Sequence, residues 1–220
     1  MKGLDRFREY FASHEAQYVL IGGAACDVLM TEQGLAFRAT KDLDLVLCVE
    51  ALDPAFARQF WAFIEAGGYE NRQKGDTKQF YRFDKPTAED FPFQIELFSR
   101  QPDGVVLEGE PHLTPIPVGE DVASLSAILL DAPYYEALIA NTREVDGVRI
   151  LDESLLIPFK ARAHLDLATR RARGEGVDAR QLIKHRGDVF RLLQVFDAER
   201  RVALSDPLKV DMIAFAEAVE

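Results

Sequence analysis

The sequence predicts an α+β protein with a mixed β-sheet flanked by helices, followed by a C-terminal helical part. Three observations support this fold class. An apolar run at 18–21 stops at a Gly-Gly pair, and the run 42–49 changes from alternating to wholly apolar. Beyond residue 152, helical patterns dominate. We therefore expect an α/β core at 1–150 and a helical domain at 151–220.

Periodicity places the individual elements, and capping residues mark several of their ends. Asp53-Pro54 begins one helix, and Gly67-Gly68 ends it. The expected helices lie at about 3–14, 24–31, 54–67, 134–143, 152–173, 178–196 and 206–220, and the expected strands at 18–21, 42–49, 78–84, 93–99, 104–108 and 148–151. Prolines clustered at 111–117 predict a loop.

Composition limits the classes of function. The chain has 220 residues, 37 acidic and 26 basic, with a formal net charge of −11, which excludes a generally basic surface for nucleic acid. Cys26 and Cys48 form no disulfide framework and suit a reducing compartment. The N-terminus lacks the apolar core of a signal peptide, and no apolar run reaches membrane-spanning length. We expect a cytoplasmic protein without a membrane partner.

The most informative residues lie between 18 and 49. Asp42 and Asp44 begin a strand and, being two residues apart, point to the same face. Their mutual repulsion would be relieved by a divalent cation, and Mg²⁺ prefers one or two carboxylates together with substrate phosphates. Glu96 projects from the later strand as a third candidate ligand. The turn at Gly22-Gly23 lets backbone N–H groups approach a phosphate.

Each of these features alone is more often a solvated strand end or an ordinary turn. Their order along the chain is much less easily explained by chance. A Rossmann dinucleotide fold is rejected, because no GxGxxG is present and the two aspartates open their strand.

The helical part has a charge opposite to that of the whole chain. Residues 160–191 contain nine Lys and Arg against four acidic residues, a local net charge of +5. Lys160, Lys184 and Asp188 lie on helical faces that could form a phosphate- or RNA-binding wall. The alternative is a solvated helical hairpin, which is the better explanation for most of these arginines.

The segments IGGAA, RATKDLDLVL and QIELFS resemble the nucleotidyltransferase fold of the DNA polymerase β superfamily. The sequence is most similar to AbiEii-type nucleotidyltransferases, the toxins of type IV toxin–antitoxin systems. Their signature is a Gly-Gly followed by Arg-x-Ser/Thr-x-Asp-hydrophobic-Asp, which Arg38, Thr40, Asp42 and Asp44 match. Three departures stand out: Lys184-His185 replaces the usual Arg-Asp of a later motif, Glu96 replaces Asp, and Ala24 replaces a Thr or Ser.

The resemblance implies a nucleotidyltransferase-like catalytic core that uses Mg²⁺ or Mn²⁺. Asp42, Asp44 and Glu96 would be catalytic and metal-binding; the nucleotide would be bound by Gly22, Gly23, Arg38, Thr40, Lys160, Lys184 and Asp188. A nucleoside monophosphate would pass from an NTP to a hydroxyl on RNA (such as tRNA), a protein or a small molecule. The resemblance also implies a toxin with an antitoxin partner.

Two alternatives remain open. A non-catalytic module on the same fold could bind a nucleotide or a protein. Metal-dependent phosphodiester hydrolysis would also use paired carboxylates, but a nuclease has no triphosphate to hold at the Gly-Gly turn.

Overall fold

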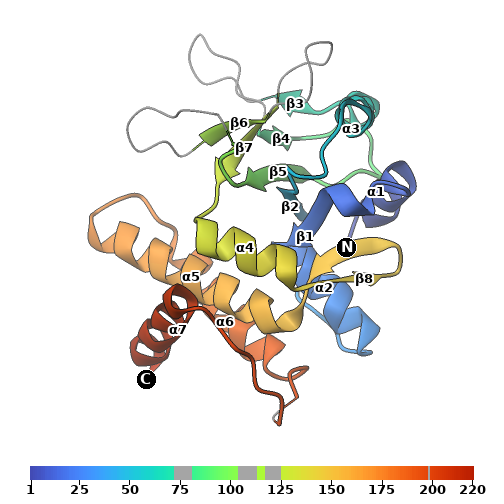
Figure 1. The fold of residues 1–220 in the computed structure, drawn as a ribbon. Coiled ribbons are helices and arrows are strands. Elements are labelled where there is room, and N and C mark those ends of the chain that lie inside the picture. The colour runs from blue at the N-terminus through green and yellow to red at the C-terminus, as the bar shows by residue number, and fades with distance from the viewer. Residues whose placement is uncertain (72–80, 104–112, 117–124, 198) are drawn as a thin grey trace.

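The structure is a computed structural model that describes residues 1–71, 81–103, 113–116, 125–197 and 199–220 (Figure 1). Its helices are α1 (Leu4–Phe11), the 3-10 helix η1 (Glu15–Gln17), α2 (Gly22–Glu32), α3 (Pro54–Gly67), α4 (Ala132–Ala140), α5 (Glu153–Ala172), α6 (Ala179–Leu192) and α7 (Asp206–Val219). Its strands are β1 (Tyr18–Ile21), β2 (Asp42–Leu47), β3 (Glu70–Asn71), β4 (Arg82–Asp84), β5 (Gln94–Ser99), β6 (Leu113–Ile116), β7 (Leu125–Leu129), β8 (Thr142–Val145) and β9 (Val148–Leu151).

The described strands form one mixed sheet in the order β3-β4-β5-β2-β1-β9-β8, and β7 pairs with β5 and β6. Strands β1 and β2 are antiparallel, whereas β2 and β5 are parallel. This arrangement confirms the predicted α+β class with a mixed sheet flanked by helices.

One face of the sheet is covered by α1 and α3 through a cluster of aromatic rings. Phe7 packs edge-on against Tyr18 of β1, and Phe60 of α3 packs against Phe83 of β4. All four side chains are fully buried. Because side chains alternate along a strand, this packing leaves Asp42 and Asp44 on the opposite face.

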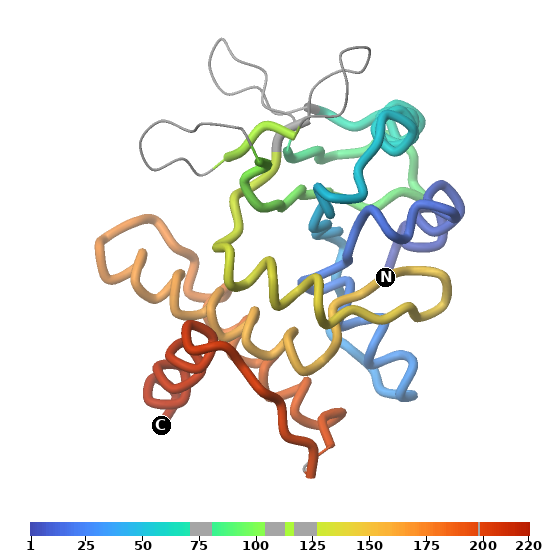
Figure 2. Tube along the Cα trace, viewed as in Figure 1, coloured from blue at the N-terminus to red at the C-terminus, as the bar shows by residue number. Residues whose placement is uncertain are grey.

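The C-terminal helices gather on one side of the molecule, away from α1 and α3 (Figure 2). Helix α5 contacts α6 and α7, and it also contacts α2 of the N-terminal part. His164 of α5 is buried and packs edge-on against Phe215 of α7. The division into domains at residue 150 stays a prediction. Among the described residues, no helix combines the length and apolar character needed to cross a membrane.

Several local expectations need correction. The proline-rich region contains β6, in which Pro115 pairs opposite Ser126 of β7. Proline is tolerated there because β6 lies at the edge of the sheet and needs no donor on its free side. Strands β7 and β8 were not expected, and α6 ends at Leu192 instead of near residue 196. The expected strand at 104–108 and residues 78–80 of another lie outside the described residues.

Candidate active site

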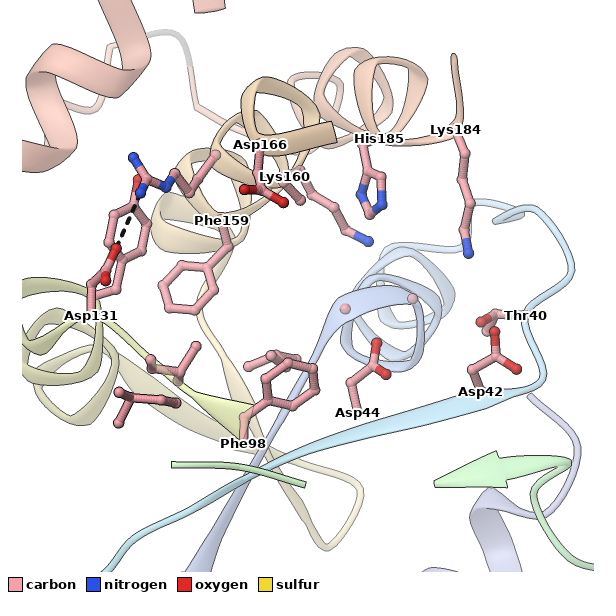
Figure 3. A pocket seen from close by; sticks show the side chains of 18 residues that line it. Thr40, Asp42, Asp44, Phe98, Asp131, Phe159, Lys160, Asp166, Lys184 and His185 are labelled. Carbon is pink, nitrogen blue, oxygen red and sulfur yellow. Dashed lines mark hydrogen bonds and ion pairs between the residues drawn. The ribbon is translucent and has the colours of Figure 1, made fainter. Parts of the chain in front are cut away.

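The two aspartates of β2 lie on a sheet face that opens into a pocket. In the parallel register of β2 and β5, Asp42 is opposite Gln94 and Asp44 is opposite Glu96. Asp42 and Asp44 line the pocket from the sheet side, as Figure 3 shows. The alternation in the sequence therefore predicted their common face correctly.

The Gly-Gly pair forms the junction between β1 and α2, directly beside Asp44. Gly22 has φ +67°, and a Cβ added there would lie 2.0 Å from Asp44 Oδ2. A Cβ on Gly23 would lie 2.5 Å from Thr40 Oγ1. Both close approaches require glycine. They place the N-terminus of α2, with its unpaired N–H groups, at the pocket, where an anion would be stabilised.

Helices α5 and α6 provide the opposite wall. Lys160, Lys184 and His185 face the aspartates across a cavity of about 490 Å³ (Figure 3). The lining residues are Ile21, Gly22, Gly23, Thr40, Asp42, Asp44, Phe98, Leu129, Leu130, Asp131, Tyr134, Phe159, Lys160, Arg162, Ala163, Asp166, Lys184 and His185. The structure thus gathers seven of the ten predicted site residues in one pocket; of the remaining three, Arg38 and Asp188 do not line it but are linked to it through Lys160.

Asp188 is fully buried and is held by several cations. Arg38 Nε donates to Asp188 Oδ1 at 2.8 Å, and Arg38 Nη2 donates to Oδ2 at 2.6 Å. Lys160 Nζ lies 3.2 Å from Asp188 Oδ2. Burial opposes ionisation of Asp188, but these cations outweigh it and keep its pKa below the usual value. The single carboxylate of Asp188 is thus shared by Arg38 and Lys160, so this cluster keeps a net positive charge.

Lys184 differs from Lys160 in its surroundings. Within the described residues, Lys160, Arg38 and Arg191 form ion pairs with Asp188, whereas Lys184 forms none. Burial lowers the pKa of Lys184, and the nearby positive charges of Arg38 and Lys160 add to this effect. An ammonium group without a carboxylate partner, beside other cations, is well suited to bind an anion.

His185 is a site residue that sequence reasoning had noted only as a departure from a motif. Burial, together with Lys160 and Lys184, lowers its pKa to about 4, so its ring is neutral at pH 7. Its Nδ1 atom is buried without a hydrogen-bond partner among the described residues. His185 therefore adds a neutral polar ring to the pocket lining.

The charge at Asp44 fits a divalent cation held jointly with a ligand. Burial raises the pKa of Asp44 to about 6, and the neighbouring carboxylates of Glu96 and Asp42 contribute to this rise. Across the described part of the chain, no three or more His, Cys, Asp or Glu side chains are grouped so as to hold a metal. Asp42 and Asp44 would thus supply two carboxylates, and phosphate oxygens of a ligand would complete the coordination, as is usual for Mg²⁺.

Glu96 lies beside Asp44 but outside the pocket lining. Arg82 of β4 is opposite Glu96 in the sheet register and forms an ion pair with it. A row of charged side chains, two carboxylates followed by one guanidinium, therefore crosses three strands from Asp44 through Glu96 to Arg82. The role of Glu96 as a third metal ligand stays a prediction.

The end of the pocket away from Lys184 combines apolar side chains with Asp131, Arg162 and Asp166, and it was not predicted from the sequence. Phe159, Ala163 and Asp166 follow each other at helical spacing, so one face of α5 lines this end. That spacing was visible in the sequence. Leu129 and Leu130 carried no such signal, because their strand had not been predicted.

Comparisons with known proteins give few matches. The sequence matches no protein-family model and no curated protein sequence. Among solved structures, the antibiotic-resistance factor ANT(2'')-Ia, determined in solution, is similar with a TM-score of 0.42 and 16% sequence identity. The match covers 100% of this chain and 95% of that chain. ANT(2'')-Ia is a nucleotidyltransferase-fold protein. Because both similarity values are low, we infer activity from the pocket residues and not from this likeness.

Proposed function

We propose that the protein is a metal-dependent nucleotidyltransferase that uses an NTP as donor. The observation that carries this proposal is the joining of three features in one pocket. These are the paired carboxylates of Asp42 and Asp44, the glycine turn at the N-terminus of α2, and the ammonium group of Lys184. Carboxylates alone would suit many metal-dependent reactions, whereas the added glycine turn and lysine suit a triphosphate.

In the proposed reaction, an acceptor hydroxyl oxygen forms a bond to the α-phosphorus of the NTP. The bond from that phosphorus to the bridging oxygen breaks, and pyrophosphate leaves with the bonding electrons. The hydroxyl proton passes to a base, for which Glu96 is the predicted carboxylate. Glu96 would have to exchange its contact with Arg82 for one with the acceptor.

The residues divide into three roles. Asp42 and Asp44 would hold Mg²⁺ or Mn²⁺, which supplies charge neutralisation and activation of the hydroxyl when bound. Backbone N–H groups at Gly22 and Gly23 and the ammonium of Lys184 would bind the phosphates. Thr40 fixes the close packing at Gly23. Lys160, which lines the pocket, joins Arg38 and Asp188 in a charged network that positions α6.

The acceptor and the biological role belong to the same proposal. Resemblance of the motifs to AbiEii-type proteins supports RNA, including tRNA, or protein as acceptor, and a small molecule is the third class. It also supports a toxin role with an antitoxin partner in the cytoplasm. We propose the boundary near residue 150 as the division between the catalytic core and the helical domain.

One observation favours a second candidate, a module that binds nucleotide without turnover. Glu96 is paired with Arg82, and the described carboxylates do not form a group of three around a metal. If Arg82 keeps Glu96 engaged in the presence of nucleotide, the site would bind NTP and release no pyrophosphate.

Incubation with each α-³²P-labelled NTP, Mg²⁺ and cell extract separates these candidates. We expect label on a macromolecule or small molecule and release of pyrophosphate, both lost in Asp44→Asn. Asp206→Asn is the matched control, since Asp206 is exposed at the start of α7. Binding without label transfer would favour the non-catalytic module, and equal transfer by wild type and Asp44→Asn would remove Asp44 from the mechanism.

A further inference from the structure

The end of the pocket away from Lys184 has two aromatic rings that the proposed chemistry does not use. Phe98 comes from β5 and Phe159 from α5, and Figure 3 shows them on either side of the same space. Leu129 and Leu130 add apolar surface to this end, which Asp131, Arg162 and Asp166 also line. Tyr134 packs edge-on against Phe159 with ring centroids 5.1 Å apart, which helps to fix the orientation of that ring.

The sheet register gives the distance between the carboxylates and the aromatic end. Phe98 follows Glu96 by two residues on the same face of β5, and it is opposite Val46, two residues after Asp44. Two residues along a parallel strand correspond to about 6.6 Å. This separation suits a ligand whose charged group lies at the aspartates and whose planar group is one sugar ring away.

Helix α5 also contributes one charged and one aromatic side chain to the pocket. Lys160 directs its ammonium to the charged end of the pocket, and the preceding residue, Phe159, directs its ring to the other end (Figure 3). Ala163 lies one turn after Phe159 and also lines the pocket, where its short side chain leaves space beside the ring. On the sheet and on the helix alike, a charged group therefore lies at one end of the pocket and an aromatic ring at the other.

We propose that Phe98 and Phe159 form the nucleobase subsite, in which the base of the NTP stacks between the two rings. This inference rests on the proposed function, because it requires the triphosphate at the charged end. A cavity of about 490 Å³ lies within the range for a single small ligand. Stacking on phenylalanine accepts every base, so the subsite binds all four NTPs with little discrimination.

Titration calorimetry in the presence of Mg²⁺ tests the subsite with two probes, each NTP and inorganic tripolyphosphate. We expect Phe159→Leu and Phe98→Leu to weaken binding of all four NTPs by about tenfold or more. Tripolyphosphate, which has no base, should bind to both variants as it does to wild type. Phe190→Leu is the matched control, because Phe190 is half-exposed on α6 and does not line the pocket.

A rescue variant and a melting curve separate lost stacking from lost folding. Phe159→Tyr keeps an aromatic ring and should bind NTPs about as tightly as wild type, and all variants should melt cooperatively. If the leucine variants fold and bind NTPs like wild type, the nucleobase subsite is wrong and the triphosphate site survives. If the wild type binds neither an NTP nor tripolyphosphate, the proposed function fails and this inference fails with it.

Discussion

Arg38 and Asp188 are separated by 150 positions in the sequence, and they form a two-point ion pair in the structure. Asp188 is fully buried, while the side chain of Arg38 is 20% exposed. Lys160 and Arg191 also contact the same carboxylate, at 3.2 and 3.3 Å. The pair joins α6 to the loop before β2, so it connects the two walls of the pocket.

Breaking this pair should cost substantial stability. Asp188→Asn leaves Arg38 and Lys160 without their shared carboxylate, and we expect the free energy of unfolding to fall by about 3 kcal/mol. Arg38→Met should have a smaller effect, because Lys160 and Arg191 still contact the Asp188 carboxylate. Urea denaturation measures both. Arg180→Met serves as control; Arg180 is 88% exposed and should change stability by less than about 0.5 kcal/mol.

The same pair predicts a dependence of stability on pH. The pKa of Asp188 is lowered in the folded protein, because its cation contacts outweigh the effect of burial. Its stabilisation is therefore present above the unfolded pKa and is lost as the pH falls through the folded pKa. The difference between wild type and Asp188→Asn should be largest near pH 7 and should shrink in increasingly acidic buffer. A constant difference at all pH values would contradict a charge-based role.

Asp44 should behave in the opposite way. Burial and the negative charge of Glu96 raise the pKa of Asp44 from 3.8 to about 6. At a pH between these two values, Asp44 is therefore protonated in the folded protein and ionised in the unfolded protein. Ionised Asp44 therefore destabilises the metal-free protein above pH 6. We expect Asp44→Asn to raise the melting temperature at pH 7.5 by about 2–4 °C, allowing for partial solvent screening.

Calorimetry in the presence of a chelator measures the higher melting temperature of Asp44→Asn. The difference from wild type should disappear near pH 4. A lower melting temperature of Asp44→Asn at pH 7.5 would mean that the carboxylate stabilises the fold even without a cation.

Gly22 should be sensitive to a single added methyl group. Gly22 and Gly174 both have positive φ, +67° and +80°, so alanine is strained at either position. Only at Gly22 would the new Cβ meet a neighbour, 2.0 Å from Asp44 Oδ2; nothing lies within 4 Å at Gly174. Gly22→Ala should therefore lower the melting temperature more than Gly174→Ala and also abolish nucleotide binding. Equal behaviour of the two variants would argue against a phosphate turn at Gly22.

The sequence predicted best the parts of the fold that depend on local patterns. The alternation at 42–47 indicated both the strand and the common face of Asp42 and Asp44, and Asp53-Pro54 marked the start of α3. Strand β7 was missed because its pairing with β5 and β6 depends on distant partners, as does the tolerance of Pro115 in β6.

Contacts between residues far apart in the sequence explain which features of the site were not predicted. The charge pattern of α5 and α6 suggested that Lys160 and Lys184 act alike, since nothing local showed that Asp188 pairs with Lys160 and not with Lys184. Likewise, the ion pair of Glu96 with Arg82 follows from the register of β4 against β5, which no short sequence motif encodes.

Binding of an NTP with Mg²⁺ to wild type and to the double variant Asp42→Asn/Asp44→Asn tests the central claim most directly. Calorimetry should show saturable, metal-dependent binding to wild type and at least a tenfold weaker interaction in the double variant. Asp206→Asn should bind like wild type. Equal binding by wild type and the double variant, or no binding of any NTP to the wild type with Mg²⁺ present, would contradict a metal-dependent nucleotide site at these two aspartates.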